Sequence, residues 1–426
     1  MANGSNGTHA LDDFSVDPGY SFVHRRHGRV VKLNYGGEIT LVAGREELRA
    51  ALMNPEVFSS QHHFPNGHSP FLGVMTPPTP VRAVPIELDP PAHTEFRQAL
   101  ATFFKPAAVQ SLAPEIQELA TWCIDQHIES GAMDLFHDLA KLVPAMTTMR
   151  LIGLPKADAR IIADGVHSMS EDRFALSPTW VVLVKATTDA VRERRKQPRD
   201  DLISHLLSIH IADRPLTDTE IFEVCFTMVV GGMATTARLL LGSLSHLSVH
   251  TDDRARLIKH PEFIPDAIEE FLRYYSPVPI LCRTATSDFA IGKTCIKEGA
   301  RVGMGYAAAN RDPEAIHDPD AIHIDRQQKG HMALGFGPHH CIGATLGRLE
   351  ARLVIEMVLE RMPDFALNHD ELCSRWEAMP PTPSARGISW AERVQHGLPV
   401  TFTPSSSRHA LDGFKLRSLS DHLRKP

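Results

Sequence analysis

Apolar residues in the middle of the chain recur at spacings of three and four, which is the period of a helix with one buried face. This pattern runs from about residue 91 to residue 272. It predicts helices at 107–127, 133–152, 157–169, 178–196 and 200–209. A further stretch, Ile221–Val249, is the most apolar in the chain and follows a capping box formed by Thr217 and Glu220. A helix this long and this apolar is expected to cross the protein interior.

Shorter patterns precede the helical part. Val30–Val42 alternates apolar and polar residues around Gly36-Gly37, which predicts a β-hairpin, and a short helix is expected at Gly44–Met53. Residues 60–91 are crowded with proline, glycine and histidine and predict a long loop. Loops of this length in compact proteins often cover a site.

After Pro277 the pattern changes again. Short strand-like runs, such as Phe289–Ile291 and Arg301–Val302, lie between glycine turns, and a helix is expected at Leu346–Arg361. The chain as a whole therefore predicts a mainly α fold with small β-sheets, an α+β class.

Composition limits the kind of protein this is. The 426 residues are 43% hydrophobic and 22% charged, as in a folded protein with a large core. The net charge of −7 argues against nucleic acid as a partner. No uninterrupted apolar run reaches the roughly 20 residues of a membrane span, and Met1–Phe14 lacks a signal-peptide core. We therefore expect a soluble, cytoplasmic protein.

One of the six cysteines lies in an unusual setting. Glycines at 335, 337 and 343 surround Cys341, which opens the predicted helix. Glycines allow a tight turn and a close approach to a flat ligand, and a helix N-terminus favours a thiolate. An axial iron ligand needs both. These residues alone leave a second interpretation equally open, namely a buried free cysteine in a glycine-rich turn.

The segment Leu334–Gly343 resembles the cysteine-ligand loop of the cytochrome P-450 haem-thiolate monooxygenases, especially those of the soluble bacterial type. Four further segments match the same family in order and spacing, namely 88–97, 231–236, 270–273 and 310–313. The resemblance implies a cytochrome P-450 fold, with the long central helix crossing the haem. It also implies haem b (iron protoporphyrin IX) as cofactor and Cys341 as its metal ligand.

The resemblance also implies the boundaries of the folded unit. Residues 16–404 are expected to form a single catalytic domain. Residues 1–15 are expected to be a flexible N-terminal tail, and residues 405–426 a C-terminal appendage. No internal repeat divides the chain further.

By resemblance, four residues address the haem propionates. They are His93, Arg97, Arg283 and His339. Arginine binds carboxylates with two hydrogen bonds, and histidine donates one.

Another pair, Glu270 and Arg273, lies at i, i+3 on one helix face. The resemblance implies that this pair is structural and that it ties its helix to the loop before the cysteine. Arg326 is a candidate third member.

Two positions depart from the family pattern. Gly232, Ala234 and Thr235 fall in the oxygen-binding segment, but members usually carry an acid where this chain has Ala234. Thr235 keeps a hydroxyl that can bond to a carbonyl or hold a water. Leu334 replaces the usual phenylalanine of the cysteine loop, which can alter the redox potential of the iron.

Three hypotheses about function follow. The first is a monooxygenase that hydroxylates a small hydrophobic molecule with O₂ and electrons from a separate ferredoxin and ferredoxin reductase. The second, suggested by Ala234, is an unusual oxidation such as oxidative coupling or peroxide-driven turnover. The third is a haem-binding sensor without turnover. A monomer is expected.

The substrate pocket is expected where family members have theirs, namely at the long loop, the helices near residues 160–190 and the central helix. Arg348 and Arg352 are candidates for docking an acidic ferredoxin. The candidate pocket residues are Phe71, Leu72, Val229, Val230, Val278 and Ile280.

Overall fold

The computed structural model describes residues 28–34, 38–61, 72–75, 79, 81–167, 178–327, 330–377, 396–408, 411 and 413–423. Most of these residues are helical. The helices are α2 (Arg45–Leu52), α3 (Ala92–Leu100), α4 (Pro106–Gln110), α5 (Ala113–Asp125), α6 (Leu142–Ile152), α7 (Ala159–His167), α8 (Pro178–Lys196), α9 (Leu202–Ser208), α10 (Asp218–Val249), α11 (Thr251–Lys259), α12 (Ile264–Tyr275), α13 (Tyr306–Ala309), α14 (Ala344–Arg361), α15 (His369–Glu377) and α17 (Leu419–Leu423).

The strands are short and form four small sheets in this part of the chain. The largest has the order β1-β2-β10-β7-β3, and a three-stranded sheet has the order β11-β12-β4. The two others are the pairs β5-β6 and β8-β9. The strands are β1 (Val30–Asn34), β2 (Glu38–Val42), β3 (Phe58–Ser59), β4 (Ala132–Asp134), β5 (His210–Ile211), β6 (Arg214–Pro215), β7 (Ile280–Ala285), β8 (Phe289–Ile291), β9 (Thr294–Ile296), β10 (Arg301–Gly305), β11 (Ala366–Leu367) and β12 (Pro399–Thr401).

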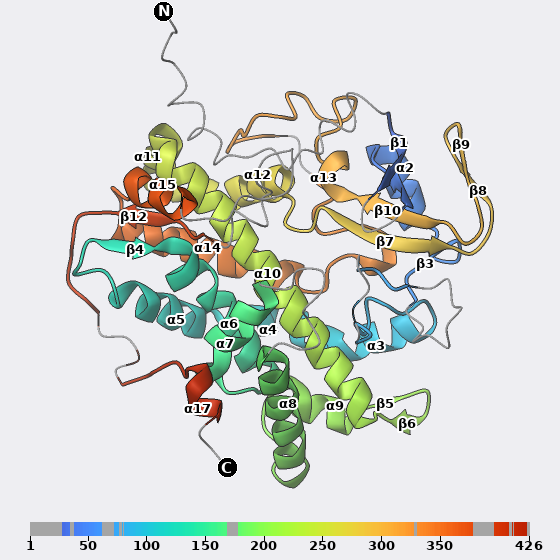
Figure 1. Ribbon diagram of the computed structural model, residues 1–426, viewed down its shortest axis with the longest axis horizontal. Helices are drawn as coiled ribbons and strands as arrows, with labels where there is room; N and C mark the ends of the chain where they lie inside the picture. The colour runs from blue at the N-terminus through green and yellow to red at the C-terminus, as the bar shows by residue number, and fades with distance from the viewer. Residues whose placement is uncertain are drawn as a thin grey trace, which may run out of the picture.

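Helix α10 organises the molecule. Figure 1 shows it running diagonally across the fold, with the five-stranded sheet on one side and α5, α6 and α7 on the other. The predicted capping box is present, because the Thr217 side chain accepts from the Glu220 N–H and the Glu220 carboxylate accepts from the Thr217 N–H. By length and composition α10 could cross a membrane, but 67% of its most apolar window is buried in the protein, as in the core helix of a soluble protein.

Several predicted elements are confirmed. The hairpin pairs Val30 with Val42 in antiparallel register, and the helix expected at Gly44–Met53 is α2. Two predicted helices were wrong in part. Pro114 starts a new helix, α5, because a proline in the first turn needs no backbone donor. The start of the expected helix 133–152 is instead strand β4, paired with β12, followed by a π-helical turn that Asp134 caps.

The segment expected to be an appendage lies against the helical part. The Phe414 ring meets the edge of Trp122 on α5, with 5.2 Å between ring centroids. The Arg417 N–H donates to the Ala157 carbonyl at 2.7 Å, and both Arg417 and His422 contact the buried Asp158 carboxylate. The described residues after 405 therefore cover the region between α5 and α7. Residues 1–15 lie outside the described residues.

The crossing of α10 and α12 provides a test of the packing. A Cβ atom at Gly242 would lie 2.6 Å from two ring carbons of the buried Tyr275. We expect Gly242→Ala to lower the free energy of unfolding by about 1–3 kcal/mol, because the added methyl group would force a buried ring to shift. A Cβ atom at Gly231, in the same helix, would have no atom of another segment within 4 Å. Gly231→Ala should therefore be neutral or stabilising by up to about 1 kcal/mol. Urea unfolding of both variants checks this, and equal effects would contradict it.

Candidate functional site

A mainly apolar cavity of about 260 Å³ separates α10 from the segment around Cys341. Residues from α3, α6, α10, β7 and α14 line it together with the loop before α14. The Cys341 side chain is exposed to the inside of this cavity, and the protein surrounds the cavity at this point. Gly231, in the middle of the buried α10, is exposed for the same reason.

The loop around Cys341 holds the sulfur in a tight turn. Gly335 and Gly337 adopt φ values of +73° and +70°, which favour glycine. The Cys341 N–H donates to the Leu334 carbonyl at 2.8 Å. Burial raises the pKa of the Cys341 thiol, while a hydrogen bond from the Gly343 backbone N–H lowers it. A backbone donor therefore faces the sulfur, as expected from the glycine pattern.

Helix α10 forms the opposite wall. The Thr235 hydroxyl donates to the Gly231 carbonyl at 2.7 Å, which is the back-bond that the sequence allowed. Gly232 also lines the cavity and packs so closely on α6 that a Cβ atom there would lie 2.6 Å from Oγ1 of Thr148. Ala234 is buried and is not among the lining residues. The helix stays regular through this segment.

The four predicted propionate-binding residues lie close together. The rings of His93 and His339 are 4.0 Å apart between centroids. Burial and the nearby Arg97 lower the pKa of His93 to about 4. Burial, Arg283 and His93 lower the pKa of His339 to about 2. Both imidazoles are therefore neutral near pH 7 in the surroundings that the protein itself provides. Arg283 lies within strand β7, opposite Val302.

This corner of the cavity carries positive charge, and the acid whose charge raises the pKa of His93, Asp89, accepts hydrogen bonds from Ser59 and Ser60. Among the described residues, the Arg97 guanidinium forms no hydrogen bond or ion pair, although the residue is partly buried and lines the cavity. Nδ1 of His93 is buried without a partner. Arg283 is buried and has no acidic partner in the same part of the chain. Buried cations are normally paired. The corner therefore fits a ligand that brings its own carboxylates.

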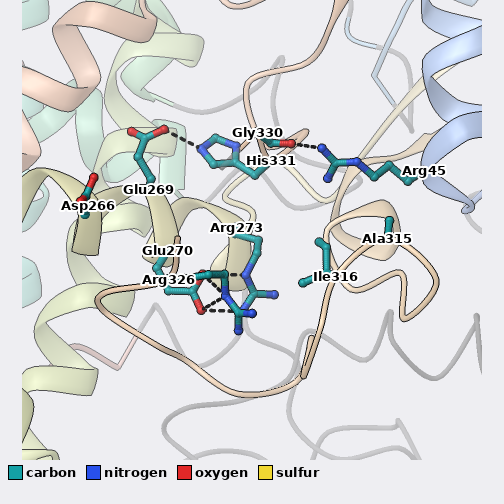
Figure 2. A pocket seen from close by; sticks show the side chains of 10 residues that line it. All are labelled: Arg45, Asp266, Glu269, Glu270, Arg273, Ala315, Ile316, Arg326, Gly330 and His331. Atoms are coloured by element: carbon teal, nitrogen blue, oxygen red, sulfur yellow. Dashed lines mark hydrogen bonds and ion pairs between the residues drawn. The ribbon is translucent and has the colours of Figure 1, made fainter. Parts of the chain in front are cut away.

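Behind the cysteine loop, one carboxylate is shared by two guanidinium groups. Figure 2 shows Arg273 and Arg326 converging on Glu270. Arg273 donates to both carboxylate oxygens at 2.7 and 2.8 Å, and Arg326 donates to both at 2.9 and 3.0 Å. The remaining guanidinium N–H groups donate to backbone carbonyls, including that of Ala321. Arg326 is thus the third member.

This network reaches the cysteine loop through Asn310. The Arg273 guanidinium donates to the Asn310 carbonyl at 3.0 Å. The Asn310 side chain in turn accepts from the Met332 N–H at 2.6 Å, nine residues before Cys341. The sequence interpretation of Glu270 and Arg273 as structural therefore agrees with their contacts.

The predicted substrate pocket needed correction. Val278 lines the cavity, but Ile280 does not, because side chains alternate along β7 and it is Leu281 that faces inward. On α10 the lining positions follow a spacing of four, from residue 227 to 239. Val229 and Val230 fall on other faces of that helix and pack against the core.

Two predicted pocket residues come from the long loop. Leu72 is 44% exposed and is not among the lining residues. Phe71 lies outside the described residues. The loop therefore contributes Pro85 and Ile86 to the cavity among its described residues.

The candidate ferredoxin-docking arginines are neutralised by neighbours. Arg348 donates to both oxygens of the Glu269 carboxylate at 2.6 and 2.8 Å. Burial raises the pKa of Glu269, but the hydrogen bonds from Arg348 and His331 outweigh it and lower the pKa to about 2. Arg352 pairs with Glu356 at 3.4 Å. Neither arginine offers an unpaired charge.

One lining residue was missed entirely by sequence reasoning. Glu350 on α14 lines the cavity and is only 2% exposed. A signal was present, because Glu350 stands at a spacing of four from both Leu346 and Val354 on the buried face of its helix. A carboxyl on such a face calls for an explanation.

The comparisons with known proteins agree with this geometry. The chain is 32% identical to the steroid C26-monooxygenase of Mycolicibacterium smegmatis over 362 residues, which are 83% of this chain and 85% of that protein. It belongs to the cytochrome P-450 family. The family model described as "Cytochrome P450" matches residues 250–371, and the fold and enzyme class predicted from the sequence are thereby confirmed.

Other members of the family are similar at comparable levels. Nocardicin C N-oxygenase of Nocardia uniformis subsp. tsuyamanensis is 30% identical, covering 84% of this chain and 90% of the relative. The structure of a mutant of the cytochrome P-450 EryK in complex with erythromycin B superposes with a TM-score of 0.77 at 26% identity, covering 93% of this chain and 98% of the other. Members of the family carry haem with a cysteine thiolate ligand, so the charged corner and the thiol face a cavity of the right kind.

The shared carboxylate yields a prediction about stability. Glu270→Gln leaves two buried guanidinium groups facing a neutral amide, and we expect the free energy of unfolding to fall by about 3–5 kcal/mol. Glu269→Gln, one residue earlier, breaks a partly exposed pair and should cost about 1 kcal/mol or less. Thermal unfolding of the two variants in parallel checks this. Similar losses in both would contradict the central role of Glu270.

Proposed function

We propose that this cytochrome P-450 monooxygenase holds haem b through Cys341 and oxidises a small hydrophobic molecule. The electrons would come from a separate ferredoxin and ferredoxin reductase. The observation that carries this proposal is a thiol that lines one cavity beneath α10 together with the unpaired guanidinium of Arg97 and the side chains of His93 and His339. When bound, haem supplies the activation of O₂ and the insertion of one oxygen atom into the substrate. We further propose that the protein is cytoplasmic and monomeric.

Two groups of residues would hold the haem, one for the iron and one for the propionates. Cys341 would bind the iron, and the Gly343 N–H would stabilise the negative charge on the sulfur. Arg97, Arg283, His93 and His339 would hold the propionates. Because His93 and His339 are neutral near pH 7, each can donate one N–H to a carboxylate.

The substrate side of the cavity is mainly apolar. Its walls include Met228, Leu239, Val278 and Leu281, with the Thr227 hydroxyl as one of the few polar groups. Apolar walls with few polar groups suit a terpenoid, aromatic or similar hydrophobic molecule. The names of the relatives, among them a steroid monooxygenase and an enzyme bound to erythromycin B, support this class and a role in secondary metabolism.

A second candidate function rests on Ala234. The buried methyl group there provides no proton donor beside Thr235. An oxidation that needs less proton delivery, such as oxidative coupling or peroxide-driven turnover, would tolerate this. A haem-binding sensor is the third candidate, and the retained Thr235 hydroxyl, which lines the cavity, speaks against it.

The haem ligand can be tested by spectroscopy. The reduced protein with CO should show the strongly red-shifted Soret band of thiolate-ligated haem, and Cys341→Ala should abolish it. Cys295→Ala is the matched control, because Cys295 is also exposed but lies on β9, away from the lining residues. Loss of the band in the Cys295 variant with Cys341 intact would sink the assignment.

Turnover separates the three functions. With ferredoxin and reductase added, a substrate that shifts the spin state should stimulate NAD(P)H consumption and yield a hydroxylated product. Products of oxidative coupling, or turnover with hydrogen peroxide alone, would favour the second candidate. Inactivity with several partner systems and with peroxide would favour the sensor.

A further inference from the structure

Two threonines mark the cavity face of helix α10. Thr227 is the first residue of this helix, in chain order, that lines the cavity, and Leu239 is the last. Thr227, Gly231 and Thr235 follow one another at a spacing of four and therefore lie on one side of the helix. All three line the cavity. The two threonines are eight positions apart, which corresponds to about 12 Å along the helix axis.

The surface of the helix between these threonines is bare. A Cβ atom at Gly231 would meet no atom of another segment within 4 Å. Gly231 is also exposed, although most of α10 around it is buried, because it faces the cavity. The cavity is therefore open over the helix between Thr227 and Thr235. A molecule that lies along this side of α10 would meet one hydroxyl group near each of its ends.

The hydrogen-bonding role of the Thr227 hydroxyl is already fixed by the helix. This hydroxyl donates to the Glu223 carbonyl at 2.9 Å, as the Thr235 hydroxyl does to the Gly231 carbonyl. A hydroxyl group has one hydrogen to donate and two lone pairs that accept. The Thr227 oxygen can therefore accept a hydrogen bond from a ligand but has no hydrogen left to donate. A ligand group that pairs with it must be a hydroxyl or an N–H, since a carbonyl or an ether brings no hydrogen.

The charges near Thr227 favour a neutral donor over a cationic one. Glu223 lies one turn before Thr227 on α10, is only 5% exposed and is not among the lining residues. Its carboxylate accepts a hydrogen bond from the Arg82 guanidinium at 2.8 Å. Arg82 belongs to the loop that contributes Pro85 and Ile86 to the cavity wall. Because the arginine already neutralises this acid, the carboxylate does not attract a positively charged ligand to this end of the cavity.

We propose that the substrate is an elongated, mainly apolar molecule with a neutral hydroxyl or N–H group at one end, and that this group donates to the Thr227 hydroxyl oxygen. This inference rests on the proposed monooxygenase function and names the substrate class of that site. The apolar walls, such as Met228 and Leu281, hold the rest of the molecule. The hydrogen bond sets the orientation of the substrate, so that its other end lies toward Thr235 and is the end that is oxidised.

A wholly apolar substrate that makes no use of Thr227 is the competing explanation, because threonines bond to the preceding turn in helices without any ligand as well. Two variants of this residue separate the explanations. Thr227→Val keeps the branched shape and removes the oxygen, whereas Thr227→Ser keeps the oxygen. Thr148→Val is the matched control, because Thr148 lines the same cavity from α6 and also carries a hydroxyl.

The first measurement is binding and needs no turnover. The probes are dodecan-1-ol and its methyl ether, which share one chain but differ in the donor hydrogen. Spin-state titrations of the haem-loaded ferric protein give the Kd of each. The ratio of the ether Kd to the alcohol Kd should fall by roughly 5–10-fold in Thr227→Val, as for the loss of one neutral hydrogen bond. It should stay unchanged in Thr227→Ser and Thr148→Val. An unchanged ratio in Thr227→Val, an equal fall in Thr148→Val, or no binding of the alcohol to the parent protein would overturn the proposal.

The position of oxidation then tests the orientation. With ferredoxin and reductase added, the parent protein should oxidise dodecan-1-ol mainly at the carbons remote from the hydroxyl group. Thr227→Val should spread the oxidation along the chain, as the methyl ether should in the parent protein. Oxidation beside the hydroxyl group in the parent protein would contradict the proposed orientation. A missing red-shifted CO band in the parent protein would instead refute the haem assignment, whereas a normal band with an unchanged ratio of Kd values in Thr227→Val refutes the substrate class alone.

Discussion

The sharing of one buried carboxylate between two guanidinium groups fixes the part of the protein on which the site depends. Glu270 and Arg273 come from α12, and Arg326 comes from the loop before the cysteine segment. Their remaining donors bind backbone carbonyls of that same loop, which has little regular structure of its own. The network therefore replaces the backbone ladder that a sheet or helix would provide. Through Asn310 and Met332 it positions the turn that presents Cys341 to the cavity.

Helix α10 contacts its neighbours on both sides of the segment that lines the cavity. Gly232 lets α10 pack closely on Thr148 of α6, and Gly242 accepts the ring of Tyr275 from α12. These two contacts fix α10 on either side of Thr235. The guanidinium of Arg97 has no acidic partner among the described residues, and the Cys341 thiol opens into the cavity at a distance from it along the lining. This arrangement fits a ligand that supplies carboxylates to the arginine and a metal to the thiol.

The acids around the cavity differ from the family pattern at the position before Thr235. The helix that usually carries an acid beside the threonine has a methyl group there, at Ala234. The helix that follows the cysteine, α14, brings a carboxyl, Glu350, to the wall of the cavity. Burial raises the pKa of this carboxyl to about 8, although the neighbouring hydroxyls of Thr147 and Thr236 lower it.

The sequence by itself determined the elements with strong local signals. The capping box and apolar length of α10, the hairpin of β1 and β2, and the glycines around Cys341 are local patterns, because each depends on residues within a few positions of one another. The separate motifs around residues 93, 235, 270 and 341 identified the family for the same reason.

Only the tertiary structure decided the features that join distant segments. Strand β4 forms where a helix was expected because it pairs with β12. The local pattern could not show this, since β12 lies near the other end of the chain. Leu281, rather than Ile280, faces the cavity because sheet pairing sets which face of β7 is turned inward. The location and protonation of Glu350 depend on burial between helices and on threonines from α6 and α10. Local sequence can show an acid on an apolar helix face, but only the packed structure shows what that face lies against.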